Sequence, residues 1–210
     1  MARLAHSVRR EAIIEAALAV MTRKGIGATT ARDVAAEMKT SSGLIHHYFA
    51  SMDELLAAAF ERAASGDLAL TEAAVAAAAS PLLQLAAFFR TYQRTEGDWG
   101  YQIWLDAWSE AARRPALQAT SQRLNVSWHR SMHSIIESGI ADGSFTCADA
   151  SAAAWRVLSM LDGLALQVVA HPDALRPADV LPWSMRHAEL ELGLAAGTLR
   201  LDELVSDQPR

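Results

Sequence analysis

The sequence has few of the residues that build disulfide frameworks, sheets and tight loops: one cysteine, six prolines and eleven glycines among 210 residues. The single thiol, Cys147, excludes a disulfide framework and a cysteine-rich zinc site. The chain also holds 43 alanines, and alanine is the best helix former, whereas glycine and proline punctuate sheets and loops. This balance excludes an all-β fold and predicts an all-α chain that is long enough for a hydrophobic core of its own.

Long apolar runs are also missing. The most apolar stretches, such as residues 73–79, are rich in alanine and too short to span a bilayer. Glu11 and Glu15 interrupt the N-terminal region, so no signal-peptide core follows Arg9 and Arg10. We therefore expect a cytoplasmic protein without a membrane partner.

The motifs of several enzyme classes are absent from the sequence. We find no glycine-rich phosphate loop, no cysteine nucleophile beside a base, and no paired Glu-x-x-His motif of di-iron bundles. His129 and His133, at i and i+4, could share a metal ion, but no third ligand is apparent. The prediction is a protein that is not an enzyme and that carries no cofactor or metal.

Charge is distributed unevenly along the chain. Residues 1–50 carry seven basic and four acidic side chains, a net charge of +3, whereas the other 160 residues carry −8 of the overall −5. A basic N-terminal region on an acidic body favours an anionic partner for the N-terminal region, although solvated helix faces often have the same composition.

Helical periodicity recurs from end to end and predicts about nine helices. Three short ones come first, at 7–24, 30–38 and 42–47, followed by longer ones at about 51–78, 81–95, 99–112, 115–141, 148–170 and 177–199. Their starts are marked by a capping serine, by two capping boxes, and by prolines in the first turn: Ser7, Thr30 with Asp33, Ser51 with Glu54, and Pro81, Pro115 and Pro177.

The short helices at 30–38 and 42–47 are joined by a turn of about three residues, which is the arrangement of a helix-turn-helix motif. Val34, Ala35 and Phe49 are spaced to pack on the first helix, and Ala35 is small where two helices cross. The outward positions from Thr40 to Tyr48 offer hydrogen-bonding side chains. In such a motif the second helix enters the major groove of DNA.

The N-terminal quarter resembles the TetR family of one-component transcriptional regulators. The resemblance is continuous from about residue 7 to residue 60 and rests on REAIIEAA at 10–17, Gly25, ATTARDVAAEM at 28–38, SSGLIHHYF at 41–49 and SMDELL at 51–56. It implies an all-α homodimer, most often a repressor. The N-terminal domain, here 1–55, would bind a palindromic operator, and the C-terminal domain, here 56–210, would bind a small ligand that releases the DNA.

The resemblance also implies roles for individual residues. His47 and Tyr48 match the family's phosphate-contacting pair, and Thr40, Ser42 and His46 are placed to meet base edges. Arg3, His6, Arg9 and Arg10 form a basic leader that could follow the backbone or enter the minor groove. The full set of expected DNA contacts is Arg3, Arg9, Arg10, Thr30, Arg32, Lys39, Thr40, Ser41, Ser42, Gly43, His46, His47, Tyr48 and Ser51.

Four positions depart from the usual family pattern. Lys39 stands where glycine is usual, Thr40 replaces valine, Ser42 replaces a frequent lysine or arginine, and Met52 replaces a frequent lysine. We expect Lys39 to make the turn looser or to be strained. Because the changes at Ser42 and Met52 remove cations, the affinity for non-specific DNA should be modest.

All six tryptophans follow residue 98, and aromatic residues recur at helical spacing on several predicted helices. Interleaved aromatics can wall an apolar pocket, or form core and dimer contacts. We expect a small-molecule site, for a neutral or cationic and partly apolar compound, among Phe88, Tyr92, Tyr101, Trp104, Trp108, Trp128, Trp155 and Asp162. For Asp162, a helix–helix hydrogen bond and a ligand anchor are equally open. The C-terminal layout resembles a family branch that includes a choline-responsive repressor of betaine synthesis. This resemblance rests on YQIWLDAWSEAARRPALQ at 101–118, IIESGIADGSF at 135–145, LDGLALQ at 161–167 and HPD at 171–173.

In the family the last two long helices form the dimer interface. Here these helices are the predicted 148–170 and 177–199, and their apolar positions include Ala152, Trp155, Leu158, Leu161, Gly163, Leu166, Val180, Trp183, Leu190 and Leu194. Two other classes of function remain open at this point: an enzyme built on a helical bundle, and an architectural helical dimer that does not bind an operator.

Overall fold

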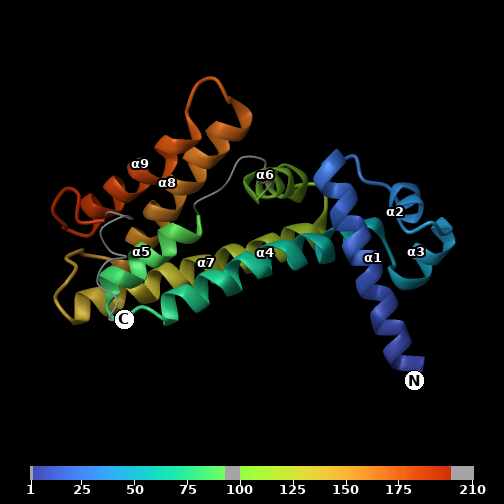
Figure 1. The fold of residues 1–210 in the computed structure, drawn as a ribbon, viewed down its shortest axis with the longest axis horizontal. Helices are drawn as coiled ribbons and strands as arrows, with labels where there is room; N and C mark the ends of the chain where they lie inside the picture. Colours follow the sequence, from blue (N-terminus) through green and yellow to red (C-terminus); the bar gives the residue numbers. More distant parts are fainter. Residues whose placement is uncertain (1, 93–99, 200–210) are drawn as a thin grey trace, which may run out of the picture. The chain divides into compact units, whose positions relative to one another are not determined.

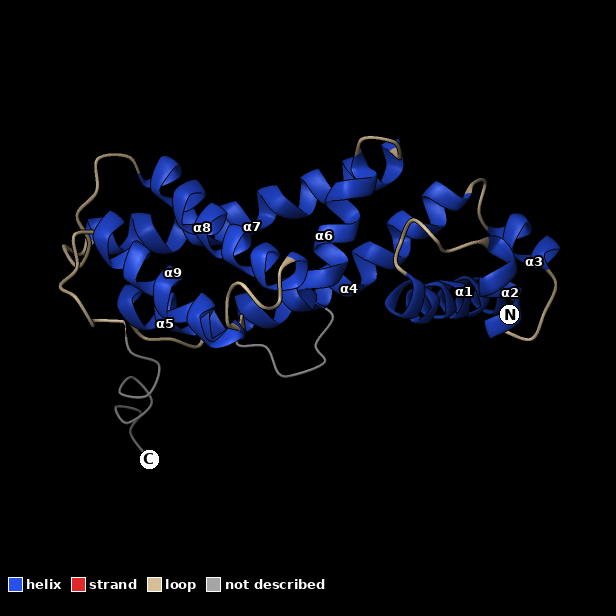
Figure 2. Ribbon diagram, turned by 90° about the horizontal axis from the view of Figure 1, so that it is seen from above, coloured by secondary structure: helices blue, strands red, loops and turns tan. Residues whose placement is uncertain are grey.

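The computed structural model describes residues 2–92 and 100–199, with side chains described from His6 onward. Within these residues the chain forms nine α-helices and no strand (Figures 1 and 2). The helices are α1 (Ala2–Lys24), α2 (Ala31–Glu37), α3 (Ser42–Tyr48), α4 (Met52–Ala76), α5 (Pro81–Thr91), α6 (Gly100–Ala111), α7 (Pro115–Ala141), α8 (Ala150–Ala170) and α9 (Pro177–Glu191). The all-α prediction is confirmed.

Two helix ends differ from the sequence prediction. Helix α1 begins at Ala2 rather than at Ser7, because the strong helix formers Ala2, Leu4 and Ala5 lead into Arg9 without a breaking residue. Helix α9 ends at Glu191 rather than near residue 199. There Gly193 has a φ of 67°, and the Leu194 amide donates to the Glu189 carbonyl at 2.8 Å, which closes the helix as a glycine C-terminal motif does.

The chain divides into two compact units, and the first is discontinuous in sequence. Unit 1 comprises Met1–Gly66 and Trp99–Asn125, and unit 2 comprises Asp67–Asp98 and Val126–Arg210. The division falls inside α4 and α7, so each of these helices contributes to both units. The units do not follow the functional boundary at residue 55, and that boundary stays a prediction.

Unit 1 has one apolar core that joins its two segments. Side chains from α1 to α4 pack together with side chains of α6 and the first half of α7, including Ile13, Val20, Ile26, Ile45, Phe49, Leu56, Phe60, Ile103, Ala107, Leu117 and Leu124. Asp53 fixes the start of α7, because its carboxylate accepts the amides of Ala116 and Leu117 at 2.9 and 3.3 Å. Helix α6 is therefore part of the same packed body as the helix-turn-helix.

Unit 2 places α8 and α9 side by side (Figures 1 and 2). Its packing leaves no room at Gly139 in α7, where an added Cβ would lie 2.1 Å from the ring of Phe145. The buried Glu189 carboxylate accepts the Leu199 amide at 2.9 Å and pairs with Arg186 at 3.1 Å. These contacts hold the segment after α9 against the unit.

Candidate nucleic-acid interface and ligand region

Helix α2 starts with the capping box that the sequence predicts. The Thr30 hydroxyl accepts the Asp33 amide at 3.3 Å, and the Asp33 carboxylate accepts the Thr30 amide at 3.0 Å. A hydrogen bond from Lys24, followed by one from Thr30, lowers the pKa of Asp33 to about 2. Asp33 is therefore ionised at neutral pH and occupies the end of the helix where the dipole favours an anion.

The turn between α2 and α3 holds Lys39 in a left-handed conformation, with a φ of 53°. The Thr40 amide donates to the Ala35 carbonyl at 2.9 Å, and the Lys39 amide donates to the Ala36 carbonyl at 3.1 Å. This pair of bonds is the Schellman pattern, whose left-handed position is usually glycine. Of the two outcomes expected for Lys39, the structure shows the strained one.

The recognition helix α3 presents a polar outer face. Thr40, Ser41, Gly43, His46 and His47 are exposed, and Ser42 and Tyr48 are half-buried. Ile45 and Phe49, which point inward, belong to the core of unit 1. The predicted base-reading and phosphate-contacting residues thus lie on the solvent side of a short helix that two buried side chains hold in place.

The N-terminal leader is helical rather than an extended arm. The ring of His6 lies 4.6 Å from the ring of Tyr48, and the ring of His47 meets Tyr48 edge-on at 5.2 Å. The Arg10 guanidinium lies 4.7 Å above the ring of Phe49, whereas Arg9 is exposed. The side chain of Arg3 lies outside the described residues.

The remaining cations of the N-terminal region divide into two groups. Arg23 pairs with Glu37, and Lys24 pairs with Asp33 at 2.7 Å, so both connect α1 to α2. Arg32 and Lys39 are exposed. At the start of α4, the exposed Ser51 hydroxyl accepts the Glu54 amide at 3.1 Å, as predicted.

Five of the seven aromatic residues predicted to wall a ligand site fall into two clusters, one in each unit. In unit 2, Phe88, Tyr92 and Trp128 form three mutual contacts, with ring centroids 5.3–5.7 Å apart. In unit 1, Trp104 lies 5.6 Å from Trp108 and packs edge-on against Phe60 at 4.9 Å; Tyr101, also on α6, is half-buried.

Trp155 belongs to neither cluster. Its ring stacks on His129 at 4.4 Å, and His129 in turn stacks on His133 at 5.8 Å. The imidazole Nε2 of His129 lies 3.0 Å from the Ser151 carbonyl oxygen. Among the described residues, no three histidine, cysteine, aspartate or glutamate side chains are grouped as metal ligands.

Asp162 lies in the middle of the apolar helix α8, in unit 2. Burial raises the pKa of its carboxyl from 3.8 to about 7. A carboxyl with this pKa is partly protonated at neutral pH, so its charge state responds to a nearby cation.

The outer face of α8 and α9 is apolar and open to solvent. Trp155, Met160, Trp183 and Leu190 are exposed, Trp183 to 53% and Leu190 to 64%. Trp155, Met160, Gly163 and Leu164 also line a shallow groove of about 550 Å³ together with polar residues of α8 and with His187 of α9. Leu158, Leu161 and Val180, expected at this face, are instead buried, because they point toward the interior.

Helix α8 is long and apolar enough to cross a membrane by length and composition, contrary to the expectation that every apolar stretch is too short. Arg156 and Asp162 interrupt the apolar run of α8, but its mean hydropathy stays high. About a third of its most apolar window is buried within the chain. The core helix of a soluble protein passes the same test of length and composition.

Two regions of the chain match known families of bacterial regulators. Residues 13–59 match the bacterial regulatory proteins of the tetR family, and residues 82–193 match the C-terminal region of BetI-type transcriptional repressors. The HTH-type transcriptional regulator BetI of Paraburkholderia phymatum is 33% identical over 164 residues, covering 76% of this chain and 81% of that protein. The chain belongs to the TetR family of transcriptional regulators.

Solved structures of other regulators have the same fold. A transcriptional regulator from Pseudomonas aeruginosa superposes with a TM-score of 0.75 at 25% identity, over 88% of this chain and 91% of that one. A second, from Saccharomonospora viridis in complex with choline, has a TM-score of 0.79 at 23% identity, over 89% of this chain and 98% of that one. The chain is thus a DNA-binding TetR-family regulator with a BetI-type C-terminal region.

Within this TetR-family chain, sequence reasoning missed the contact between His6 and Tyr48. The two residues are 42 positions apart, and their rings meet only because α1 starts earlier than predicted. An uninterrupted helix-forming segment before Ser7 was the signal that could have revealed it.

Proposed function

We propose that the protein is a homodimeric repressor that binds an inverted-repeat operator through α3 and releases it when a small molecule binds. The observation that carries this proposal is the outer face of α3. His46 and His47 are exposed on this helix and Ser41 is exposed at its N-cap, while Ile45 and the C-cap residue Phe49 are buried in the core. A two-fold dimer presents this face twice, which favours a palindromic site.

The dimer is proposed to form through the outer face of α8 and α9. An exposed surface that includes two tryptophans, Met160 and Leu190 is more apolar than a monomer usually leaves open. Large aromatic side chains are typical of the core of protein interfaces. We therefore assign Trp155 to this interface rather than to the ligand pocket, since it lies on the open face and apart from the aromatic cluster of unit 2.

The ligand is proposed to be a cation or a neutral compound with an apolar part. Phe88, Tyr92 and Trp128 supply aromatic rings that attract a quaternary ammonium group. Burial keeps the carboxyl of Asp162 partly protonated at neutral pH. A bound cation would favour the ionised form of this carboxyl. The likeness to a regulator solved with choline makes choline the first compound to test.

The proposed partners are thus operator DNA, a second copy of the chain and a small molecule, and the proposed location is the cytoplasm, where DNA is accessible. No membrane partner is proposed for α8, because its open face is already assigned to the dimer.

Selection of duplexes from a random pool with the full-length protein tests the proposal. We expect an inverted repeat and a two-fold symmetric footprint. His47→Ala and Tyr48→Ala should weaken binding to all duplexes equally, whereas Thr40→Ala and His46→Ala should change the preferred sequence. Recovery of no sequence would favour an architectural dimer, and identical behaviour of all four variants would contradict the division of roles.

A further inference from the structure

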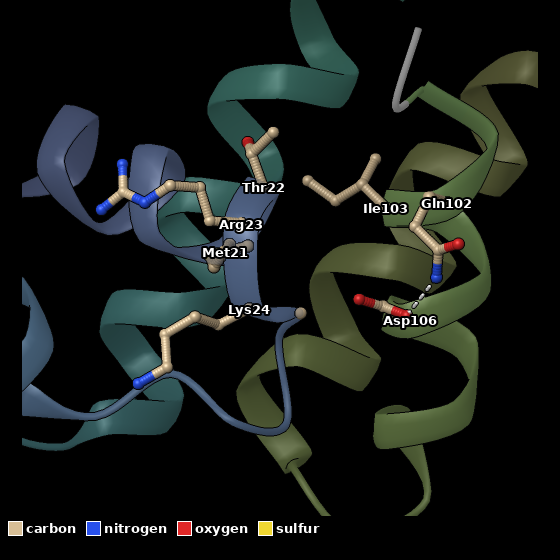
Figure 3. A pocket seen from close by; sticks show the side chains of 8 residues that line it. Met21, Thr22, Arg23, Lys24, Gln102, Ile103 and Asp106 are labelled. Atoms are coloured by element: carbon tan, nitrogen blue, oxygen red, sulfur yellow. Dashed lines mark hydrogen bonds between the residues drawn. The ribbon is translucent and has the colours of Figure 1, made fainter. Parts of the chain in front are cut away.

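Helix α6 places two carboxylates against the loop that connects α1 to α2. The Asp106 carboxylate accepts the Ile26 amide through Oδ2 at 3.2 Å and the Gln102 side-chain amide through Oδ1 at 2.8 Å. Figure 3 shows the Gln102–Asp106 bond and the Asp106 carboxylate turned toward the end of α1. The loop therefore donates one of its amide hydrogen bonds to a side chain that follows it by 80 residues in the sequence.

Glu110, one helical turn after Asp106, lies over the same loop. A Cβ at Gly27 would lie 3.0 Å from Glu110 Oε1, and a Cβ at Gly25 would lie 3.0 Å from Asp106 Oδ2. Arg113 and Arg114 bind the Glu110 carboxylate at 2.8 and 2.9 Å, which lowers its pKa and keeps it charged. The close approach of both carboxylates thus depends on two glycines in the loop.

The loop sets the position at which α2 begins. Ile26 is fully buried in the core of unit 1, and the Thr29 hydroxyl donates to the Gly25 carbonyl at 2.8 Å. The next residue, Thr30, caps α2 and is one of the expected phosphate contacts. A displacement of the loop would therefore move the start of α2 and the DNA-facing surface with it.

Apolar packing does not fill the space beside these contacts. A cavity of about 300 Å³ lies between the last turn of α1 and α6 and is lined by Met21, Thr22, Arg23, Lys24, Gly25, Gln102, Ile103 and Asp106 (Figure 3). Ile103 and Ala107 pack α6 into the same core as Ile26, and beside the cavity the hydrogen bond of Asp106 adds a polar contact between α6 and the loop. Helix α6 also carries Tyr101, Trp104 and Trp108, three of the residues expected at a ligand site.

We propose that Asp106 is a positioning residue that couples α6 to the recognition helices through its hydrogen bond to the Ile26 amide. The DNA-binding position of α2 and α3 requires this bond, and a shift of α6 that breaks it weakens operator binding. By linkage, operator binding must in turn stabilise α6, although no residue of α6 is among the expected DNA contacts. This inference rests on the proposed function and names how that function is regulated.

The test compares the full-length wild type with Asp106→Ala, Asp106→Asn and the control Ser109→Ala. The Ser109 side chain is exposed on the same helix, and its hydroxyl donates to the Asp106 carbonyl within α6 at 3.0 Å. The probe is the duplex that the wild type selects from a random pool. Duplex affinity is measured for each protein, and hydrogen exchange of residues 25–30 and 100–111 is followed with and without the duplex.

In the wild type, the duplex should slow exchange in both segments. Asp106→Ala should bind the duplex at least about fivefold more weakly, with its dimer mass unchanged, and α6 should no longer respond to DNA. Asp106→Asn keeps a side-chain oxygen for the Ile26 amide and should stay within about threefold of wild type, and Ser109→Ala should match wild type.

Three results would overturn the coupling while leaving the proposed function intact. The first is hydrogen exchange of α6 in the wild type that does not change when the duplex is added, a measurement that needs no variant. The second is a folded Asp106→Ala protein that binds within twofold of wild type, and the third is an Asp106→Asn protein as weak as Asp106→Ala. A wild type that selects no duplex would instead overturn the proposed function itself, and the coupling with it.

Discussion

The two units expose opposite kinds of surface. Unit 1 turns Ser41, His46 and His47 outward from a short helix, and unit 2 turns Trp183 and Leu190 outward from long ones. Hydrogen-bonding side chains suit a hydrated polyanion, whereas large apolar side chains suit a protein surface that excludes water. Although both units are helical, the chemistry of their exposed side chains indicates a different kind of partner for each.

The largest effect is expected from Asp162, whose carboxyl lies in the apolar helix α8 of unit 2. The folded state holds a proton on Asp162 up to a pH of about 7, whereas the unfolded chain releases it near 3.8. Stability should therefore fall as pH rises from about 4 to 7, by at most about 4 kcal/mol. Asp162→Asn should remove this loss, as denaturant unfolding at fixed protein concentration would show. If the difference in unfolding free energy between wild type and Asp162→Asn does not change with pH, the raised pKa of Asp162 is refuted.

A slightly smaller effect is expected from Gly139→Ala in unit 2. The new methyl would overlap the buried ring of Phe145, and overpacking of this kind costs about 3 kcal/mol. The control is Gly66→Ala in α4, where nothing lies within 4 Å of an added Cβ and the helix should gain up to about 1 kcal/mol. Thermal unfolding distinguishes the two, and equal stability of both variants would contradict the tight packing at Gly139.

The role of the apolar surface of unit 2 in dimerisation can be tested by introducing a charged side chain there. Trp183→Glu should weaken the dimer by about 2 kcal/mol or more, because it places a charge in the proposed interface. Leu70→Glu, at a more exposed position on α4, should leave the dimer unchanged. Sedimentation of both variants at several concentrations provides the comparison. An unaltered dimer in Trp183→Glu would place the interface elsewhere.

The smallest effect concerns the turn of unit 1. Lys39→Gly should stabilise the protein by about 1 kcal/mol, since glycine adopts a positive φ without strain. The same change removes an exposed cation, so operator affinity should fall and its salt dependence should become shallower. Ala36→Gly, in the helix before the turn, should instead destabilise by about 1 kcal/mol. A fall in stability with Lys39→Gly would mean that the lysine is not strained.

Local signals made the helix-turn-helix predictable. The Thr30 capping box, the buried Ile45 and Phe49, and the prolines at helix starts act over a few residues, and all are visible in the sequence. The roles of individual DNA-facing residues stay predictions, since they depend on the family resemblance.

Contacts between distant segments could not be predicted in the same way. Trp128 meets Phe88 across 40 residues, and Asp106 meets Ile26 across 80. In the sequence, Asp106 and Glu110 at i and i+4 are indistinguishable from a solvated helix face. Likewise, periodicity places Leu158 and Trp155 on one apolar helix without showing that one is buried and the other exposed.

The discontinuity of unit 1 has a consequence for protein engineering. A chimera that joins residues 1–55 to the body of another regulator would leave Ile103, Ala107, Leu117 and Leu124 behind, together with the helix start that Asp53 caps. Such a hybrid would expose apolar core to water and lose Asp106. Exchange of DNA specificity between relatives should therefore either transplant residues 1–66 and 99–125 together or change only the outward side chains of α3.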